Sequence, residues 1–328
     1  MLEPKRAVIG MDGGGSYTRA MVCDLEGNIL SYVETGSASI HKDLHAKENV
    51  IKAIHTAVQQ SGLPYQHIIG LAAGIAGCDS EADLEWISSL TEAEGINCPR
   101  WHMNDAVAAH YGSFLGKPGI IAISGTGSII TAITEQGLCI RNDQYQHYAS
   151  SAARFIAYSA VQEALAGYID DSDHDIVLKM MEHWKVESIE QLYTCGRNSF
   201  GVDRRERDLR FGQFAPYVTD AAAHGSTLAR RVCDKAVYEL KVGIELLGRS
   251  FSEETVDRAF IGSVINSLYM KGALVEQLAA SRQKQYRLIE DSLPPVADAV
   301  LYAYQQLGIN VDDEVVSNLK NGKSRSNG

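Results

Sequence analysis

The sequence predicts an α/β fold in which one unit occurs twice. From Val8 to Asp24, two short apolar runs flank three consecutive glycines, which is typical of two strands joined by a tight hairpin. Strand, glycine-rich turn and strand return in the same order at Gly119–Thr134, about 110 residues later. Strand–glycine–strand patterns are common enough to recur by coincidence, but two that open the same succession of elements favour an internal duplication.

The first unit continues with alternating strands and helices. Ile29–Thr35 predicts a third strand. The apolar face of Leu44–Ser61 predicts a helix with Asp43 as its N-cap and an end at Gly62. The next predicted elements are a buried strand at Ile68–Ala73, a helix that the capping box Ser80–Asp83 opens and that runs to Glu94, a strand at Arg100–Met103 and a helix that begins at Ala106.

The second unit begins like the first and then becomes mainly helical. Its predicted elements are strands at Gly119–Ser124, Ile129–Thr134 and Leu138–Arg141, helices at Ser151–Ala166 and Ser226–Leu247, a strand at Arg258–Ile261, a helix to Ala280 and a strand at Tyr286–Ile289. Residues 168–225 are charged and irregular, and the pattern assigns no element to them.

Domain boundaries follow from the restart of the pattern. We expect an N-terminal domain at 1–117 and a C-terminal domain at 118–317, with a last helix at Val296–Leu307 that could pack back on the N-terminal domain. The polar tail at 318–328 predicts disorder.

The composition is that of a globular protein, and its charge disfavours two classes of partner. The 328 residues are 45% hydrophobic and carry a formal net charge of −11 with no long basic run. Because phosphate backbones select basic patches, nucleic acid and anionic membranes are disfavoured, whereas nucleotides are not. The six scattered cysteines favour free thiols over a zinc site or a disulfide framework. With no leader-like segment and no apolar run of ~18 residues, we expect a cytoplasmic protein.

The first glycine hairpin carries groups that suit a polyphosphate. It presents a carboxylate where the first strand ends, three glycines that leave the backbone open to close approach, and two hydroxyls: Asp12, Gly13, Gly14, Gly15, Ser16 and Thr18. Backbone N–H groups, hydroxyls and a carboxylate within seven residues are suited to a magnesium-bound phosphate chain. The alternative is a plain hairpin turn, which needs only one or two glycines.

A second hairpin and a late glycine extend this pattern. The turn Gly125–Thr126–Gly127–Ser128 is neither a Walker A loop nor a dinucleotide fingerprint. Two such hairpins in equivalent places suggest a clamp on a phosphate chain. Gly262 and Ser263, which follow a late strand, could approach a nucleoside.

Asp105 ends a predicted strand just before a helix. A carboxylate there could take the proton from an attacking hydroxyl. Asp is also a frequent helix N-cap, and the two roles are compatible.

These motifs and their order resemble the BadF/BadG/BcrA/BcrD ATPase family, the branch of the actin-like ATPase superfamily that holds N-acetylglucosamine kinase. Asp12–Thr18 resembles the first phosphate motif of the superfamily. Asn104–Asp105–Ala106 matches the family's Asn-Asp-Ala, and Ser124–Ser128 matches its second phosphate motif. Gly262–Ser263 partly matches the adenosine motif, and Pro295–Ala299 loosely echoes a late Pro-x-x-Gly-Ala motif.

The resemblance implies two RNase H-like domains around a nucleotide cleft that binds ATP and Mg²⁺. Carried over, Asp12 orients the magnesium through water, Asp105 is the general base, the hairpins bind phosphates and Gly262 approaches the adenosine. The acceptor is a small molecule, and the residues placed beside it are Asn104, Asp105, Thr126, Gly127, Ser39 and His147.

Two motifs of the family's sugar kinases are altered. Thr35–Ile40 lacks the Asn that holds the sugar, and Gln144–Ala152 lacks the acidic pair that precedes the helix of the second domain. Only His147 corresponds there, and a histidine in such a place is more often structural than a ligand. The nucleotide half of the site is therefore better supported than the acetamido-sugar half.

Three functions are weighed on this basis. The first is an ATP-dependent kinase that acts on a hydroxyl of a sugar or amino sugar. The second is an ATP-binding regulator without kinase activity, which the altered sugar motifs would permit. The third is an activating ATPase of a radical dehydratase, which needs close cysteine ligands for an iron–sulfur cluster, and the scattered cysteines argue against it. A homodimer is compatible with the sequence.

Overall fold

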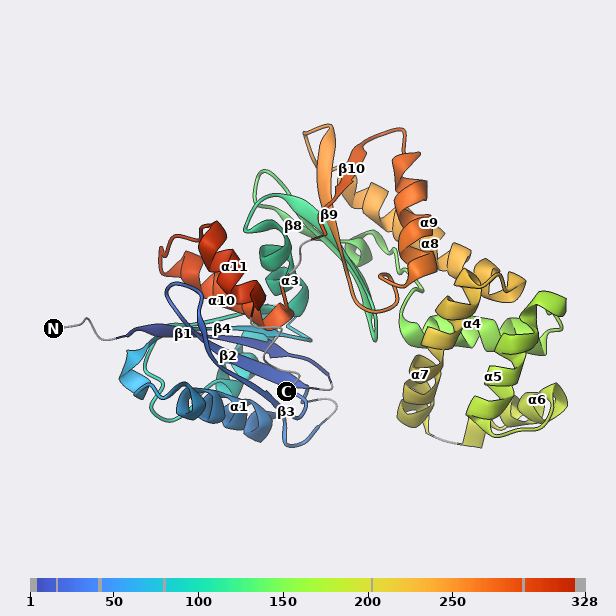
Figure 1. The fold of residues 1–328 in the computed structure, drawn as a ribbon, viewed down its shortest axis with the longest axis horizontal. Helices are drawn as coiled ribbons and strands as arrows, with labels where there is room; N and C mark the ends of the chain where they lie inside the picture. Colours follow the sequence, from blue (N-terminus) through green and yellow to red (C-terminus); the bar gives the residue numbers. More distant parts are fainter. Residues whose placement is uncertain are drawn as a thin grey trace. The chain divides into compact units, whose positions relative to one another are not determined.

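The computed structural model describes residues 5–15, 17–40, 43–78, 81–201, 203–290 and 293–321. The chain forms two compact units, each with its own sheet and helices (Figure 1). Unit 1 combines the described residues up to Lys117 with those from 293 onward, and unit 2 spans Pro118–Glu290.

Unit 1 contains a five-stranded sheet in the order β3-β2-β1-β4-β5. Its strands are β1 (Ala7–Gly13), β2 (Thr18–Asp24), β3 (Ile29–Thr35), β4 (Ile68–Ile75) and β5 (Arg100–Asn104). β2 is antiparallel to both β1 and β3, whereas β1, β4 and β5 run parallel. The carboxyl ends of β1, β4 and β5 therefore meet at one edge of the sheet, which is where ligands bind in open α/β sheets.

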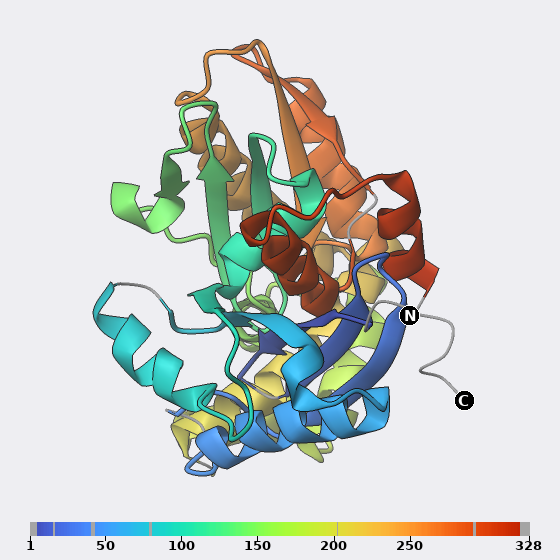
Figure 2. The same ribbon diagram turned by 90° about the vertical axis from the view of Figure 1, so that its left-hand side faces the viewer.

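Helices cover both faces of this sheet (Figure 2). They are α1 (Ala46–Ser61), α2 (Leu84–Leu90), α3 (Asp105–Phe114), α10 (Pro295–Gln306) and α11 (Asp313–Asn321), with 3₁₀ turns at Tyr65–His67 and Glu81–Asp83. Alternate residues of β1 point to opposite faces, so Ile9 and Met11 pack in the core with α1 while Val8 packs in the core with α10.

The packing of α10 explains why the end of the chain belongs to unit 1. A Cβ on Gly10 of β1 would lie 2.5 Å from the Val296 carbonyl oxygen, so the helix rests directly on the strand. The buried Tyr304 hydroxyl donates a hydrogen bond to the carbonyl of Asp24. The sequence prediction counted this helix in the second domain, at 118–317, and allowed that it could pack on the first.

Unit 2 contains a second five-stranded sheet, in the order β10-β9-β6-β7-β8. Its strands are β6 (Gly119–Ser124), β7 (Ser128–Ile133), β8 (Cys139–Arg141), β9 (Thr255–Ile261) and β10 (Gln285–Leu288). The meander β6-β7-β8 is antiparallel, and β9 and β10 extend it in parallel with β6. This is the strand order of unit 1 repeated, so the predicted duplicated α/β fold is confirmed.

The helices of unit 2 include a stretch for which the sequence pattern gave no element. They are α4 (Ala153–Leu165), α5 (His174–Trp184), α6 (Ile189–Arg197), α7 (Arg204–Ala223), α8 (Thr227–Gly248) and α9 (Leu268–Ala279), with 3₁₀ turns at Asn142–Tyr145, Asp171–Asp173 and Ser199–Gly201. Residues 168–225 thus hold α5, α6 and α7. The Trp184 ring packs against the rings of Phe211 and Phe214, and all three join the core of the unit.

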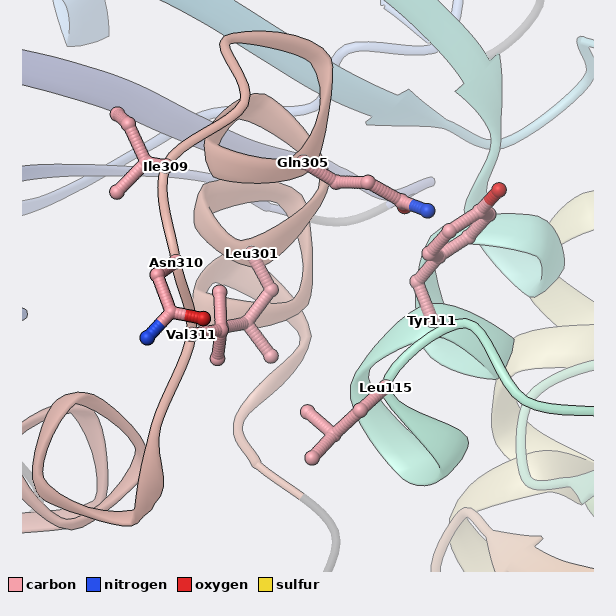
Figure 3. Close-up of a pocket in the computed structure, with 7 residues that line it drawn as sticks. All are labelled: Tyr111, Leu115, Leu301, Gln305, Ile309, Asn310 and Val311. Atoms are coloured by element: carbon pink, nitrogen blue, oxygen red, sulfur yellow. The ribbon is translucent and has the colours of Figure 1, made fainter.

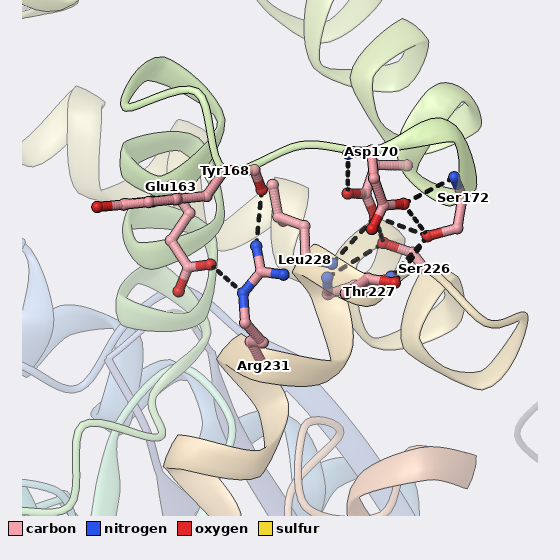
Figure 4. Close-up of polar contacts among 10 residues, drawn as sticks. Glu163, Tyr168, Asp170, Ser172, Ser226, Thr227, Leu228 and Arg231 are labelled. Atoms are coloured by element: carbon pink, nitrogen blue, oxygen red, sulfur yellow. Dashed lines mark hydrogen bonds and ion pairs between the residues drawn. The ribbon is translucent and has the colours of Figure 1, made fainter.

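Polar contacts connect this stretch to α8, and Figure 4 shows those of Ser172 with Thr227 and of Arg231 with Tyr168. A buried carboxylate adds to them. Asp173 is fully buried and accepts hydrogen bonds from the Ser226 hydroxyl at 2.7 Å and from the Leu228 amide at 3.0 Å. It therefore satisfies one orphan N–H group at the start of α8 and places its charge at the favourable end of the helix dipole. Arg231, one turn further on, contacts Glu163 and the Tyr168 carbonyl.

Several predicted helix ends are wrong. α1 has His45 at its N-cap position, and the Asp43 carboxylate accepts instead from the backbone amide of His45 and from Asn49 Nδ2. α2 ends at Leu90 rather than Glu94, and Ser80 of its predicted capping box lies outside the described residues. α10 is not the last helix, since α11 follows and includes residues 318–321 of the predicted disordered tail. Residues 322–328 lie outside the described part of the chain.

Candidate active site

The first glycine hairpin joins β1 to β2 at the carboxyl edge of the unit 1 sheet. The Gly14 amide donates to the Tyr17 carbonyl at 2.9 Å, and the Gly14 carbonyl accepts from Ala38 at 3.1 Å. A Cβ on Gly13 would lie 2.4 Å from Ile75 Cδ1, so Gly13 lets the Ile75 side chain pack against the strand end. Gly15 lies at the bend, and Ser16 lies outside the described residues.

Asp12 lies at the end of β1 and is held by an arginine that the sequence analysis did not single out. Arg19 Nη1 donates to Asp12 Oδ2 at 3.1 Å, and Arg19 Nε donates to Glu34 Oε2 at 3.0 Å. The Asp12 side chain is 14% exposed. Burial raises the pKa of its carboxyl, and the contact with Arg19 partly opposes that rise.

Thr18 precedes Arg19 on β2, so its side chain projects to the opposite face of the sheet from that of Arg19, and it is fully buried. Its hydroxyl has no hydrogen-bond partner within the described ranges. Burying a hydroxyl without a hydrogen-bond partner costs free energy, so packing alone does not explain why a threonine occupies this position.

Asn104 and Asp105 lie at the same edge of the sheet as Asp12. Asp12 is opposite Gly74 of β4, and Ile75 is opposite Asn104 of β5, so the two acidic residues are two strands apart, about 10 Å at the usual strand spacing. Asn104 is the N-cap of α3: its Oδ1 accepts from the Ala106 amide at 2.8 Å. The N-cap position considered for Asp105 is therefore wrong. Asp105 is the first residue of α3, where its Oδ1 also accepts from the Ala106 amide at 2.9 Å and its charge is favourable to the helix dipole.

Ser39 completes this edge of unit 1. It follows Ala38, whose amide bonds the Gly14 carbonyl, so the loop after β3 lies against the hairpin. Asp12, Ser39 and Asp105 thus all belong to loops or strand ends that leave the sheet at one edge.

The second hairpin, between β6 and β7, is built by the same kind of bonds within unit 2. The Gly125 amide donates to the Gly127 carbonyl at 2.9 Å, and the Gly125 carbonyl accepts from Ala153 at the start of α4 at 2.7 Å. The Ser128 hydroxyl contacts the Ser151 hydroxyl at 2.7 Å. A Cβ on Gly127 would meet nothing within 4 Å, so this glycine faces open space into which a ligand could fit.

Gly262 and Ser263 lie beside this hairpin, next to Gly125. Gly262 has φ +104°, and a Cβ there would lie 2.3 Å from the Ser124 carbonyl oxygen. That carbonyl accepts from the amides of Val264 and Ile265. Gly262 is therefore needed for packing, because the ends of β9 and β6 approach closely there. The same close approach places Gly262 next to the hairpin.

A second arginine missed by the sequence analysis contacts this hairpin. Arg154 Nη1 donates to the Thr126 carbonyl at 3.3 Å, and its Nε lies 3.8 Å from Asp208 Oδ2. The residue is the second of α4, so a positive charge stands beside the turn. The sequence signal that could have identified Arg154 is a basic residue at the start of the helix that follows the second glycine turn.

His147 has a packing role. Its Nδ1 contacts Asn142 Nδ2 at 3.3 Å, and a Cβ on Gly243 of α8 would lie 2.8 Å from its ring, so the imidazole fits where Gly243 leaves space. Asn142 in turn accepts from the Ile130 amide. These contacts account for the residue without a substrate.

A cavity of about 200 Å³ in unit 1 has no residue of the first hairpin in its lining (Figure 3). It is lined by α3, α10 and the segment that follows α10, through Tyr111, Leu115, Leu301, Gln305, Ile309, Asn310 and Val311. None of these side chains is charged, so the cavity is unsuited to phosphate.

A magnesium ion fits the Asp12 hairpin on chemical grounds. Within the described ranges, no three His, Cys, Asp or Glu side chains gather to form a complete metal site. Mg²⁺ usually keeps several waters and relies on one or two carboxylates together with substrate phosphates. Asp12, a carboxylate that is not fully buried and lies beside a glycine turn, has the chemistry that such a site needs.

The duplicated sheet order and the paired glycine hairpins define an actin-like ATPase fold of the kind found in sugar kinases. A solved structure from Chromobacterium violaceum, proposed to be an N-acetylglucosamine kinase, matches with a TM-score of 0.66 over 90% of this chain and 98% of that one, at 21% identity. A ROK family glucokinase from Streptomyces griseus, solved with glucose and AMPPNP, matches with a TM-score of 0.57 over 91% and 98%.

The chain belongs to the BadF/BadG/BcrA/BcrD ATPase family, whose model matches residues 9–303. Among its relatives, a protein of Clostridium acetobutylicum named N-acetylmuramic acid/N-acetylglucosamine kinase is 27% identical over 273 residues, which is 80% of this chain and 86% of that protein. The glucosamine kinase of Vibrio cholerae is 23% identical over 71% of this chain and 78% of its own length. Membership in the family confirms the predicted resemblance and implies the use of ATP. No helix in the described part of the chain is long and apolar enough to cross a membrane.

Proposed function

We propose that this protein is an ATP- and Mg²⁺-dependent kinase that phosphorylates a hydroxyl of an amino sugar. The observation that carries the proposal is the meeting of the Asp12 hairpin, the Ser39 loop and Asp105 at the carboxyl edge of one sheet. The names of the two relatives support an amino sugar as the acceptor.

Each group of residues has a different role in the proposed phosphoryl transfer. Asp105 accepts the proton of the attacking hydroxyl, and Asn104 fixes the start of α3 on which Asp105 stands. The hairpins at Gly13–Gly15 and Gly125–Ser128 bind phosphate, and Gly262 with Ser263 borders the adenosine. Asp12 orients the metal through water, and bound Mg²⁺ would supply charge neutralisation on the β- and γ-phosphates. Arg154 brings a positive charge to the second hairpin.

A screen of acceptors tests this proposal. Purified protein is assayed for ADP release with Mg²⁺-ATP and a panel that includes N-acetylmuramic acid, N-acetylglucosamine, glucosamine and glucose. We expect turnover on at least one amino sugar. ATP binding without turnover on any sugar would instead support a regulator without kinase activity.

The regulator is kept as the second candidate because of one segment. Where the family's sugar kinases carry an acidic pair, Ser151 uses its hydroxyl to contact Ser128, and its carbonyl accepts from the Ser124 hydroxyl. A carboxylate reaches this segment from α8 instead, since Glu239 accepts from the Ser150 amide at 2.5 Å. The sugar side of the site is thus built differently from the family pattern.

Mg²⁺-ATP is expected to raise the melting temperature, and Gly14→Val is expected to abolish that rise. Ligand at 100 times its Kd adds about 2.7 kcal/mol of stability. A Cβ on Gly14 already lies 3.2 Å from the Tyr17 carbonyl, and two further methyls would occupy the approach to the turn. Differential scanning fluorimetry measures both shifts. Gly272→Ala, on α9 where a Cβ meets nothing within 4 Å, is the control and should keep the wild-type shift. A normal shift in Gly14→Val would reduce the hairpin to a turn.

A further inference from the structure

Three charged residues form a row across the first sheet at the hairpin. Asp12 of β1 is directly opposite Arg19 of β2, and Arg19 is directly opposite Glu34 of β3. Residues opposite one another in antiparallel strands project to the same face, so the three side chains meet there. Arg19 reaches Asp12 through Nη1 at 3.1 Å and Glu34 through Nε at 3.0 Å.

The two ends of this row differ in exposure. The Asp12 side chain is 14% exposed and that of Glu34 is 43% exposed. A mostly buried carboxylate needs a counter-charge more than an exposed one does, because an exposed carboxylate is stabilised by water. Arg19 is therefore important to Asp12 and dispensable to Glu34.

Arg19 can leave Asp12 without losing its other contacts. A different nitrogen serves Glu34, and the Tyr17 ring lies 5.9 Å from the guanidinium carbon, within cation–π range. A metal cation near the same carboxylate would be repelled by the guanidinium and would supply the counter-charge in its place.

We propose that Arg19 is a positioning residue that exchanges with Mg²⁺ for Asp12: it holds the carboxylate while no metal is bound and retreats to Glu34 when the Mg²⁺–nucleotide arrives. The inference rests on the proposed role of Asp12 at the metal. Arg19 then competes with the metal for the Asp12 carboxylate. Glu34 weakens this competition, because it offers Arg19 a second carboxylate.

The test is the Mg²⁺ concentration that gives half-maximal binding of a non-hydrolysable ATP analogue, measured by calorimetry at pH 8. Arg19→Met removes the competitor and should lower this midpoint several-fold. Glu34→Gln leaves Arg19 with Asp12 alone and should raise it. Without metal, Arg19→Met should also melt at a lower temperature than the wild type, and saturating Mg²⁺–analogue should restore most of the loss.

The second sheet offers a matched control. Arg287 of β10 is opposite Asp257 of the parallel strand β9 and bonds it at 2.6 and 2.9 Å, so it is a cross-strand arginine–aspartate pair that belongs to neither hairpin. Arg287→Met should leave the Mg²⁺ midpoint unchanged. An unchanged or raised midpoint in Arg19→Met overturns the exchange while the metal site stands. Absence of Mg²⁺-dependent binding in the wild type overturns both the exchange and the proposed site.

Discussion

Asp105→Asn is expected to lower phosphoryl transfer by roughly 10²–10⁴-fold, the range that a general base typically contributes. The substitution keeps the size of the side chain and removes its basicity and charge. Asn104, and not Asp105, occupies the N-cap of α3, so the start of the helix should survive the change. ATP binding by calorimetry and the melting temperature should therefore stay close to those of the wild type, while steady-state turnover on the best acceptor falls.

Asn104→Ala separates capping from catalysis. Loss of an N-cap costs about 1 kcal/mol of stability, so this variant should melt at a lower temperature than Asp105→Asn. If Asp105→Asn folds, binds ATP and keeps more than about a third of wild-type turnover, the role of base has to be given to another group.

The sequence predicted the fold best where glycines and apolar runs alternate. All three strands of the first meander, the turn at Gly62 that ends α1 and both hairpins are where the pattern put them, because strand edges and tight turns have local causes. In contrast, α7 was not predicted, although Phe211, Phe214, Val218 and Ala222 recur at helical spacing and are buried. Pro216 in the middle of the helix and the charged first turn concealed that period.

The sequence predicted the glycines of the candidate site, but it did not predict the charged residues that lie near them. Gly13 and Gly262 were assigned to nucleotide binding, and the structure adds a packing reason for each. Arg19 and Glu34 were not singled out, because the pairing of Asp12 with Arg19 and of Arg19 with Glu34 depends on strand register, which a one-residue slip would change. Arg154 was missed because its neighbour Thr126 is 28 residues away in the chain.

Gly262→Ala is expected to destabilise unit 2, whereas Gly127→Ala is expected to leave stability unchanged and to weaken ATP binding. At φ +104° an alanine is strained, a cost of roughly 1–3 kcal/mol, and its Cβ would lie 2.3 Å from the Ser124 carbonyl oxygen. Because that carbonyl already accepts two amides, it cannot move without losing them, so the total loss should be about 2–5 kcal/mol.

Gly127 is the matched case on the same edge of the same sheet. A methyl there meets nothing within 4 Å of the protein, so unfolding should change by less than about 0.5 kcal/mol. The same methyl would stand in the space that we assign to phosphate, and the Kd for Mg²⁺-ATP should rise at least tenfold. Chemical denaturation and calorimetry on the two variants measure these effects separately. Wild-type affinity in Gly127→Ala would show that the second hairpin does not contact the nucleotide, and wild-type stability in Gly262→Ala would show that the β9 end does not need glycine.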